Sequence, residues 1–130
     1  MEHRLPYSTG ATRDAREHAQ AFLSGRLSQH RAADCLLMLS EIVANAVRHG
    51  EPEADGRIGL RLESEPDMVR AVITDSAPEF TFDQYTFERA NLDHMGLLMV
   101  DTLASRWGLS LDGKKAVWFE VDVEPPAEER

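Results

Sequence analysis

Three polar residues recur every four positions in one helical segment of the chain. Glu41, Asn45 and His49 stand at i, i+4 and i+8, so their side chains share one stripe of a helix beside its apolar face. A carboxylate and a carboxamide one turn apart can orient a hydroxyl group or hold a hard cation such as Mg²⁺ through oxygen. Asparagine is a poor helix-interior residue, so Asn45 calls for a reason. On spacing alone, a solvated helix face remains the simpler interpretation.

The helices that must position these residues follow from apolar periodicity. Apolar residues at intervals of three and four predict helices over 13–26, 31–49 and 96–105. The second is the strongest of the three, and Gly50 is expected at its C′ position. The first is expected to take its N-cap from one of three hydroxyl residues: Ser8, Thr9 or Thr12.

The strands are predicted from alternation and from turn residues. Strands are expected over 4–8, 57–64 and 68–75, and a closing hairpin is expected around Asp112-Gly113. Residues 76–95 lack periodicity and are expected to form a long loop with one helical turn near 83–89. This order of elements predicts an α/β two-layer sandwich of the α+β kind, in which helices cover one face of a mixed, mostly antiparallel sheet.

Length and composition allow one domain and exclude several classes of protein. The 130 residues predict a single domain over 1–124 with a frayed acidic tail at 125–130. With 23 acidic against 14 basic residues, the net charge of −9 disfavours direct binding to nucleic acid. No apolar run is long enough to span a membrane and the N-terminus does not resemble a signal peptide, so a cytoplasmic protein is expected. The single cysteine, Cys35, falls on an apolar helix stripe and is expected to be an inert core residue.

Four segments in a fixed order resemble the motifs of one family. LSEIVANAVRHG (39–50) resembles the N box of the GHKL, or Bergerat-fold, ATPases and kinases, and VITDSAPEF (72–80) stands in the place of their D-x-G-x-G box. HMGLLMVDTLASRWG (94–108) is similar to their G-x-G box with its following helix, and GKKAVWFEV (113–121) is similar to their closing strands. Within that superfamily the chain most resembles the anti-sigma factor serine/threonine kinases, including their actinobacterial relatives. The resemblance covers nearly the whole chain and implies a Bergerat fold.

The resemblance also implies roles for individual residues. Glu41 takes the place of the general base that activates a serine hydroxyl of a partner protein, and Asn45 takes the place of the Mg²⁺ ligand between the ATP phosphates. Asp75 corresponds to the acceptor for the adenine amino group, and Gly96 to a residue that brings helix-start N–H groups to the phosphates. Two further residues in these boxes are expected at the nucleotide: His49 and Ala77.

The partners implied by the resemblance are proteins. They are a sigma factor, which is sequestered, and an anti-anti-sigma antagonist, which phosphorylation inactivates. The family also implies a homodimer. Competition with nucleic acid for a basic partner is compatible with the charge of −9.

Departures from the motifs shape the functional prediction. Ala77 and Glu79 replace the two glycines after Asp75, and Leu98 replaces the second glycine of the next box, so the backbone loses freedom to approach a nucleotide. We therefore expect a regulatory anti-sigma-factor-like protein with a degenerate ATP site. An active ATP- and Mg²⁺-dependent serine kinase acting on an anti-anti-sigma protein is the alternative.

The expected loop is rich in aromatic residues. We predict that its rings fold back over the degenerate pocket, and the other interpretation is that they pack a short helix against the sheet. The residues concerned are Phe80, Phe82, Tyr85 and Phe87.

Overall fold

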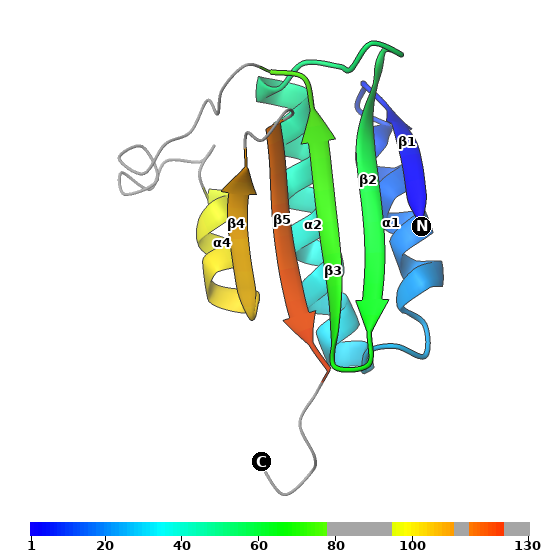
Figure 1. The fold of residues 1–130 in the computed structure, drawn as a ribbon, viewed down its shortest axis with the longest axis vertical. Coiled ribbons are helices and arrows are strands. Elements are labelled where there is room, and N and C mark those ends of the chain that lie inside the picture. The colour runs from blue at the N-terminus through cyan, green and yellow to red at the C-terminus, as the bar shows by residue number, and fades with distance from the viewer. Residues whose placement is uncertain (78–94, 111–114, 124–130) are drawn as a thin grey trace, which may run out of the picture.

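The computed structural model describes residues 1–77, 95–110 and 115–123. Five strands and three helices lie within them (Figure 1). In chain order they are β1 (Glu2–Pro6), α1 (Ala11–Leu23), α2 (Gln29–His49), β2 (Arg57–Glu65), β3 (Met68–Asp75), α4 (Met95–Leu103), β4 (Arg106–Ser110) and β5 (Lys115–Asp122).

The strands form one open sheet with the order β1-β2-β3-β5-β4 (Figure 1). Every described pair is antiparallel, so the antiparallel character is confirmed and no parallel pair occurs among the described strands. The last strand, β5, lies between β3 and β4 rather than at an edge. That order brings the end of β3 beside the start of β5, with Asp75 opposite Lys115.

The helices all cover the same face of the sheet, as the two-layer prediction requires (Figure 1). Alternate strand residues point into this layer, and β5 contributes Val117, Phe119 and Val121 to the core. The longest helix, α2, buries Met38 and Leu39 against them and packs on both α1 and α4. Each fully buried side chain of this size stabilises the fold by about 1.5–3 kcal/mol.

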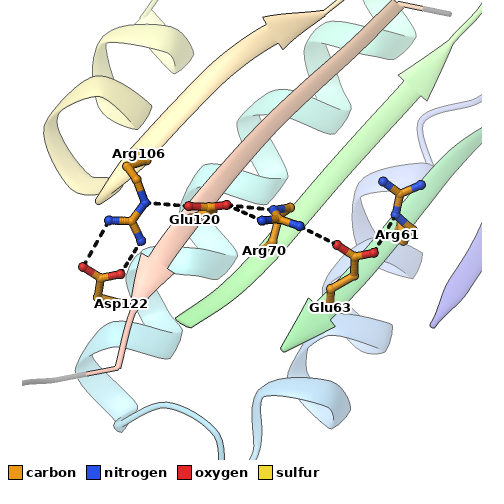
Figure 2. A network of polar contacts seen from close by, with 6 residues as sticks. All are labelled: Arg61, Glu63, Arg70, Arg106, Glu120 and Asp122. Carbon is orange, nitrogen blue, oxygen red and sulfur yellow. Dashed lines mark hydrogen bonds and ion pairs between the residues drawn. The ribbon is translucent and has the colours of Figure 1, made fainter. Parts of the chain in front are cut away.

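The opposite face of the sheet carries charged side chains that pair across four strands (Figure 2). Glu120 of β5 accepts hydrogen bonds from Arg106 of β4 and Arg70 of β3, over 2.6 and 2.8 Å. We call the whole row the charge ladder; its members are Arg61, Glu63, Arg70, Glu120, Arg106 and Asp122. Polar residues therefore alternate with core residues along these strands, as the alternation in the sequence predicts.

The ends of several elements differ from the prediction. The N-cap of α1 is Gly10, and no side chain caps this helix, so the expected hydroxyl cap is wrong. The nearest hydroxyl, that of Ser8, accepts a hydrogen bond from the Gly10 N–H instead, over 3.3 Å. The helix α2 begins at Gln29 rather than Arg31 because the Ser28 hydroxyl accepts a hydrogen bond from the Arg31 N–H at 3.2 Å. The first strand is Glu2–Pro6 rather than 4–8 because Glu2 to Pro6 pair with Arg61 to Arg57 of β2.

Some predictions fall outside the described residues. These are the helical turn near 83–89, the aromatic residues Phe80, Phe82, Tyr85 and Phe87, the turn at Asp112-Gly113 and the tail at 125–130. Among the described residues no helix has both the length and the apolar character needed to cross a membrane.

Candidate functional site

The last turns of α2 meet the end of β3 and the start of β5 around a small internal cavity. The cavity has an accessible volume of about 10 Å³, which is room for about one water molecule. Both polar and apolar side chains line it: Ile42, Asn45 and Ala46 from α2, Ile73 and Asp75 from β3, and Lys115 and Val117 from β5.

Asp75 and Lys115 form an ion pair inside the protein. Their side chains are only 3% and 4% exposed, and Lys115 Nζ lies 3.3 Å from Asp75 Oδ2. They are direct partners in the antiparallel register of β3 and β5, which sets both side chains on the helix-covered face. A charge of this burial is tolerated only when it is paired, because removing it from water is costly.

The other carboxylate oxygen of Asp75 is also engaged. Asp75 Oδ1 accepts a hydrogen bond from the Ala77 N–H at 2.8 Å, and the Glu51 N–H lies 3.5 Å from the same oxygen. Both oxygens of Asp75 therefore have donors from the chain itself. This arrangement stabilises the backbone turn that follows β3.

Gly50 permits the close approach of Asp75 to the end of α2. A Cβ atom at this position would lie 2.5 Å from Asp75 Oδ2 and 2.6 Å from the Ala46 carbonyl oxygen. Gly50 is the C-cap of α2 rather than its C′ residue, and its φ angle of −91° is in the extended region. The glycine is needed for space and not for a positive φ. The Tyr7 hydroxyl donates to the Gly50 carbonyl oxygen at 2.8 Å and holds the segment in place.

Asn45 lies one turn before the end of α2 and is 4% exposed. Its Oδ1 accepts a hydrogen bond from Arg48 Nη2 at 2.7 Å, and the guanidinium group can only donate, which fixes the orientation of the amide. Asn45 Nδ2 is buried and has no hydrogen-bond partner among the described residues. A buried donor without an acceptor is costly, and it lines a cavity of the size of a water molecule.

The remaining predicted residues lie around this centre to different extents. Glu41 and His49 are half-buried one turn to either side of Asn45 on α2, and neither lines the cavity. Ala77 is 6% exposed and directs its N–H at Asp75. Gly96 lies in the first turn of α4, the helix-start position expected of it.

Neither Lys115 nor Arg48 is among the site residues predicted from the sequence, although the position of Lys115 carries a signal. Lys115 shares the phase of Val117, Phe119 and Val121 along β5, so the alternation sets it on the core face. A lysine in phase with core residues, on a strand predicted to close the sheet, is the signal that could have found it.

An adenine nucleotide with Mg²⁺ does not fit these residues as they are arranged. The acceptor expected for the base, Asp75, is paired with Lys115, and the oxygen expected for the metal, on Asn45, is paired with Arg48. The space between them admits about one water molecule, whereas pockets for drug-sized ligands usually have about 300–1,000 Å³.

Comparisons with known proteins agree with the fold. Residues 5–120 match the family model described as the histidine kinase-like ATPase domain. Among solved structures, a chain of the SiaB-SiaC complex from Pseudomonas aeruginosa matches with a TM-score of 0.59 and 13% identity, over 95% of this chain and 89% of that chain. No curated protein matches the chain. The resemblance to the histidine kinase-like ATPases and the fold class predicted from the sequence are thereby confirmed.

Proposed function

Because the chain belongs to the histidine kinase-like ATPase domain family, we propose that it is a regulatory protein-binding module of the anti-sigma-factor type with a degenerate ATP site. Its partners in this proposal are a sigma factor, an anti-anti-sigma antagonist, or both. The observation that carries the proposal is the buried Asp75–Lys115 ion pair, in which the expected acceptor for adenine is already occupied. In this proposal the domain therefore acts by binding a partner protein and not through a nucleotide.

Two further features support a protein partner. The solved structure of similar fold is a complex of SiaB with SiaC, so a protein of this fold is found together with a protein partner. The net charge of −9 favours a basic partner surface. A cytoplasmic location belongs to the same proposal, because a sigma factor acts on transcription in the cytoplasm. The proposal also includes a homodimer.

The experiment that tests the proposal measures partner binding with and without nucleotide. Candidate sigma factors and antagonists of the source organism are titrated against the protein by calorimetry, first alone and then with ATP and Mg²⁺. We expect binding of one partner with a Kd that nucleotide changes by less than about twofold, well under 1 kcal/mol. A partner that binds only in the presence of ATP would overturn the proposal.

The alternative function is an active serine kinase. It is favoured by the geometry of α2, which keeps Glu41 one turn from Asn45 at the edge of the site. Labelled ATP, Mg²⁺ and each candidate antagonist are incubated with the protein and with the Glu41→Ala variant. Transfer of label that disappears in the variant would establish the kinase; absence of transfer in both, with partner binding intact, favours the module.

A further inference from the structure

We propose that Lys115 and Arg48 occupy the acceptors of the degenerate site and thereby prevent adenine nucleotides from binding there. This inference rests on the proposed function and deepens it, because it names the side chains that keep the nucleotide out. Lys115 stands at Asp75 where an adenine amino group would donate, and Arg48 stands at the Asn45 oxygen where a cation would bind.

The Lys115 ammonium is a strong competitor for the aspartate. Both partners are almost fully buried, and the pair is fixed by the cross-strand register and not by a flexible surface side chain. A base that takes Asp75 must displace a charged group that lies in the interior, which costs far more than displacing water. A neutral amino group gains less from the carboxylate than the ammonium does.

The Arg48 guanidinium closes the second position by charge. It donates to Asn45 Oδ1 at 2.7 Å and is permanently protonated. A divalent cation at this oxygen would face a positive group within hydrogen-bond distance of its own ligand. Lys115 and Arg48 thus occupy the two side-chain acceptors that were assigned to the nucleotide and its Mg²⁺, those of Asp75 and Asn45.

The space left between the two pairs has the size of a water molecule. Asn45 Nδ2, the buried donor without a partner in the described part of the chain, lines this space together with Asp75 and Lys115. A water molecule placed there can accept from Asn45 Nδ2 and donate to the carboxylate. The polar atoms of the site are then satisfied without a nucleotide.

Removal of Lys115 is the direct test. Binding of adenosine and of Mg-ATP is measured by calorimetry for the wild type, Lys115→Ala and Lys115→Met, with Lys114→Ala as the control that loses the same charge from the adjacent position. We expect no binding at millimolar ligand for the wild type and the control. Adenosine should bind to Lys115→Ala at least tenfold more tightly than to the wild type. Lys115→Met removes the charge but keeps most of the side-chain volume. A smaller gain in adenosine affinity for Lys115→Met than for Lys115→Ala therefore measures how much the filled space, rather than the charge, excludes the base.

A second substitution shows whether gained binding uses the aspartate. Lys115→Ala combined with Asp75→Asn should lose most of the gain, because the neutral amide oxygen is a weaker acceptor than the carboxylate. A folded Lys115→Ala variant that binds adenosine no better than the wild type overturns the inference. That result leaves the proposed function intact, since partner binding is measured separately, whereas nucleotide-dependent partner binding would overturn the function itself.

A measurement on the wild type keeps the inference testable if Lys115→Ala does not fold. The carboxyl carbon of Asp75 is observed by NMR while Mg-ATP is added to several millimolar. We expect its signal to stay in place, because the carboxylate remains bound to Lys115. Saturable movement of this signal at micromolar Mg-ATP would contradict the proposal.

Discussion

At the scale of single residues, Gly50 directly follows a helix but is required for a different reason than most glycines at such positions. A glycine directly after a helix usually ends it in the left-handed conformation, but Gly50 is extended. Its missing side chain makes room for the Asp75 carboxylate. The close approach of Asp75 to the end of α2, and with it the buried ion pair, therefore requires that residue 50 has no Cβ atom.

We predict that Gly50→Ala destabilises the protein by about 1–3 kcal/mol, because the added methyl group overlaps the Asp75 carboxylate and the Ala46 carbonyl. The measurement is urea denaturation monitored by circular dichroism. Gly10→Ala is the matched control, since a Cβ there meets its nearest atoms at 3.7 Å, an ordinary contact. Equal stability of the two variants would contradict the crowding of Gly50.

Cys35 yields a second prediction at this scale. The residue is 1% exposed, and burial, followed by the nearby Asp34 carboxylate, raises the pKa of its thiol to about 12. The thiolate is the reactive form, so at pH 8 we expect labelling by a disulfide reagent to be about a thousandfold slower than for an exposed cysteine. The control is the protein in denaturant, which should react at the ordinary rate. Fast labelling of the native protein would contradict the core position.

At the scale of elements, α2 contributes more residues to the cavity than β3 or β5 does, and its start is as well defined as its end. The Ser28 hydroxyl caps the helix through the Arg31 N–H. We predict that Ser28→Ala lowers the free energy of unfolding by about 1 kcal/mol, measured by urea denaturation. Ser24→Ala is the control, because Ser24 caps α1 through its backbone N–H and not its side chain. A loss as large in the control would argue against the side-chain cap.

The elements were largely predictable because their patterns are local. Apolar spacing along α2 and alternation along β5 each follow from neighbouring residues, and both are observed. The starts of α1 and α2 were less predictable. The N-cap of α1 is Gly10 although hydroxyl residues stand nearby, whereas Ser28 caps α2 with its side chain.

The site was predictable only in part, for a different reason. The motif order predicted that Asn45 and Asp75 belong to one site, and both line the same cavity. The partners that occupy them, Arg48 and Lys115, depend on side-chain direction and on strand register. A motif fixes which residues are present, whereas pairing across the sheet determines which atoms remain available.

At the scale of the whole molecule, the two faces of the sheet are stabilised by different forces. The helix-covered face is a hydrophobic core, and the other face carries the charge ladder (Figure 2). Glu120 is its central acceptor, 8% exposed, with one arginine on each side. Hydrogen bonds from Arg106, then from Arg70, lower the pKa of Glu120 below its usual value of 4.5. The ladder therefore links the four strands most strongly while this carboxylate is charged.

That linkage gives stability a pH dependence of known sign. Because the pKa of Glu120 is lower in the folded state, the unfolded chain binds the proton first, so the stabilisation is fully present above about pH 4.5. It is lost as the pH falls through the folded-state value. We predict that Glu120→Gln costs about 1–2 kcal/mol at pH 7, because two charge-assisted hydrogen bonds weaken.

The same variant should lose less stability on acidification than the wild type, so the two unfolding curves converge below pH 4.5. Urea denaturation at pH 7, 5, 4 and 3 measures the difference. Glu65→Gln, at the exposed end of β2, is the control that removes an equal charge and should run parallel to the wild type. A constant difference between Glu120→Gln and the wild type at every pH would mean that the carboxylate acts by packing alone. A convergent difference assigns it to charge, and shows that the ladder adds to the backbone pairing of β2, β3, β5 and β4.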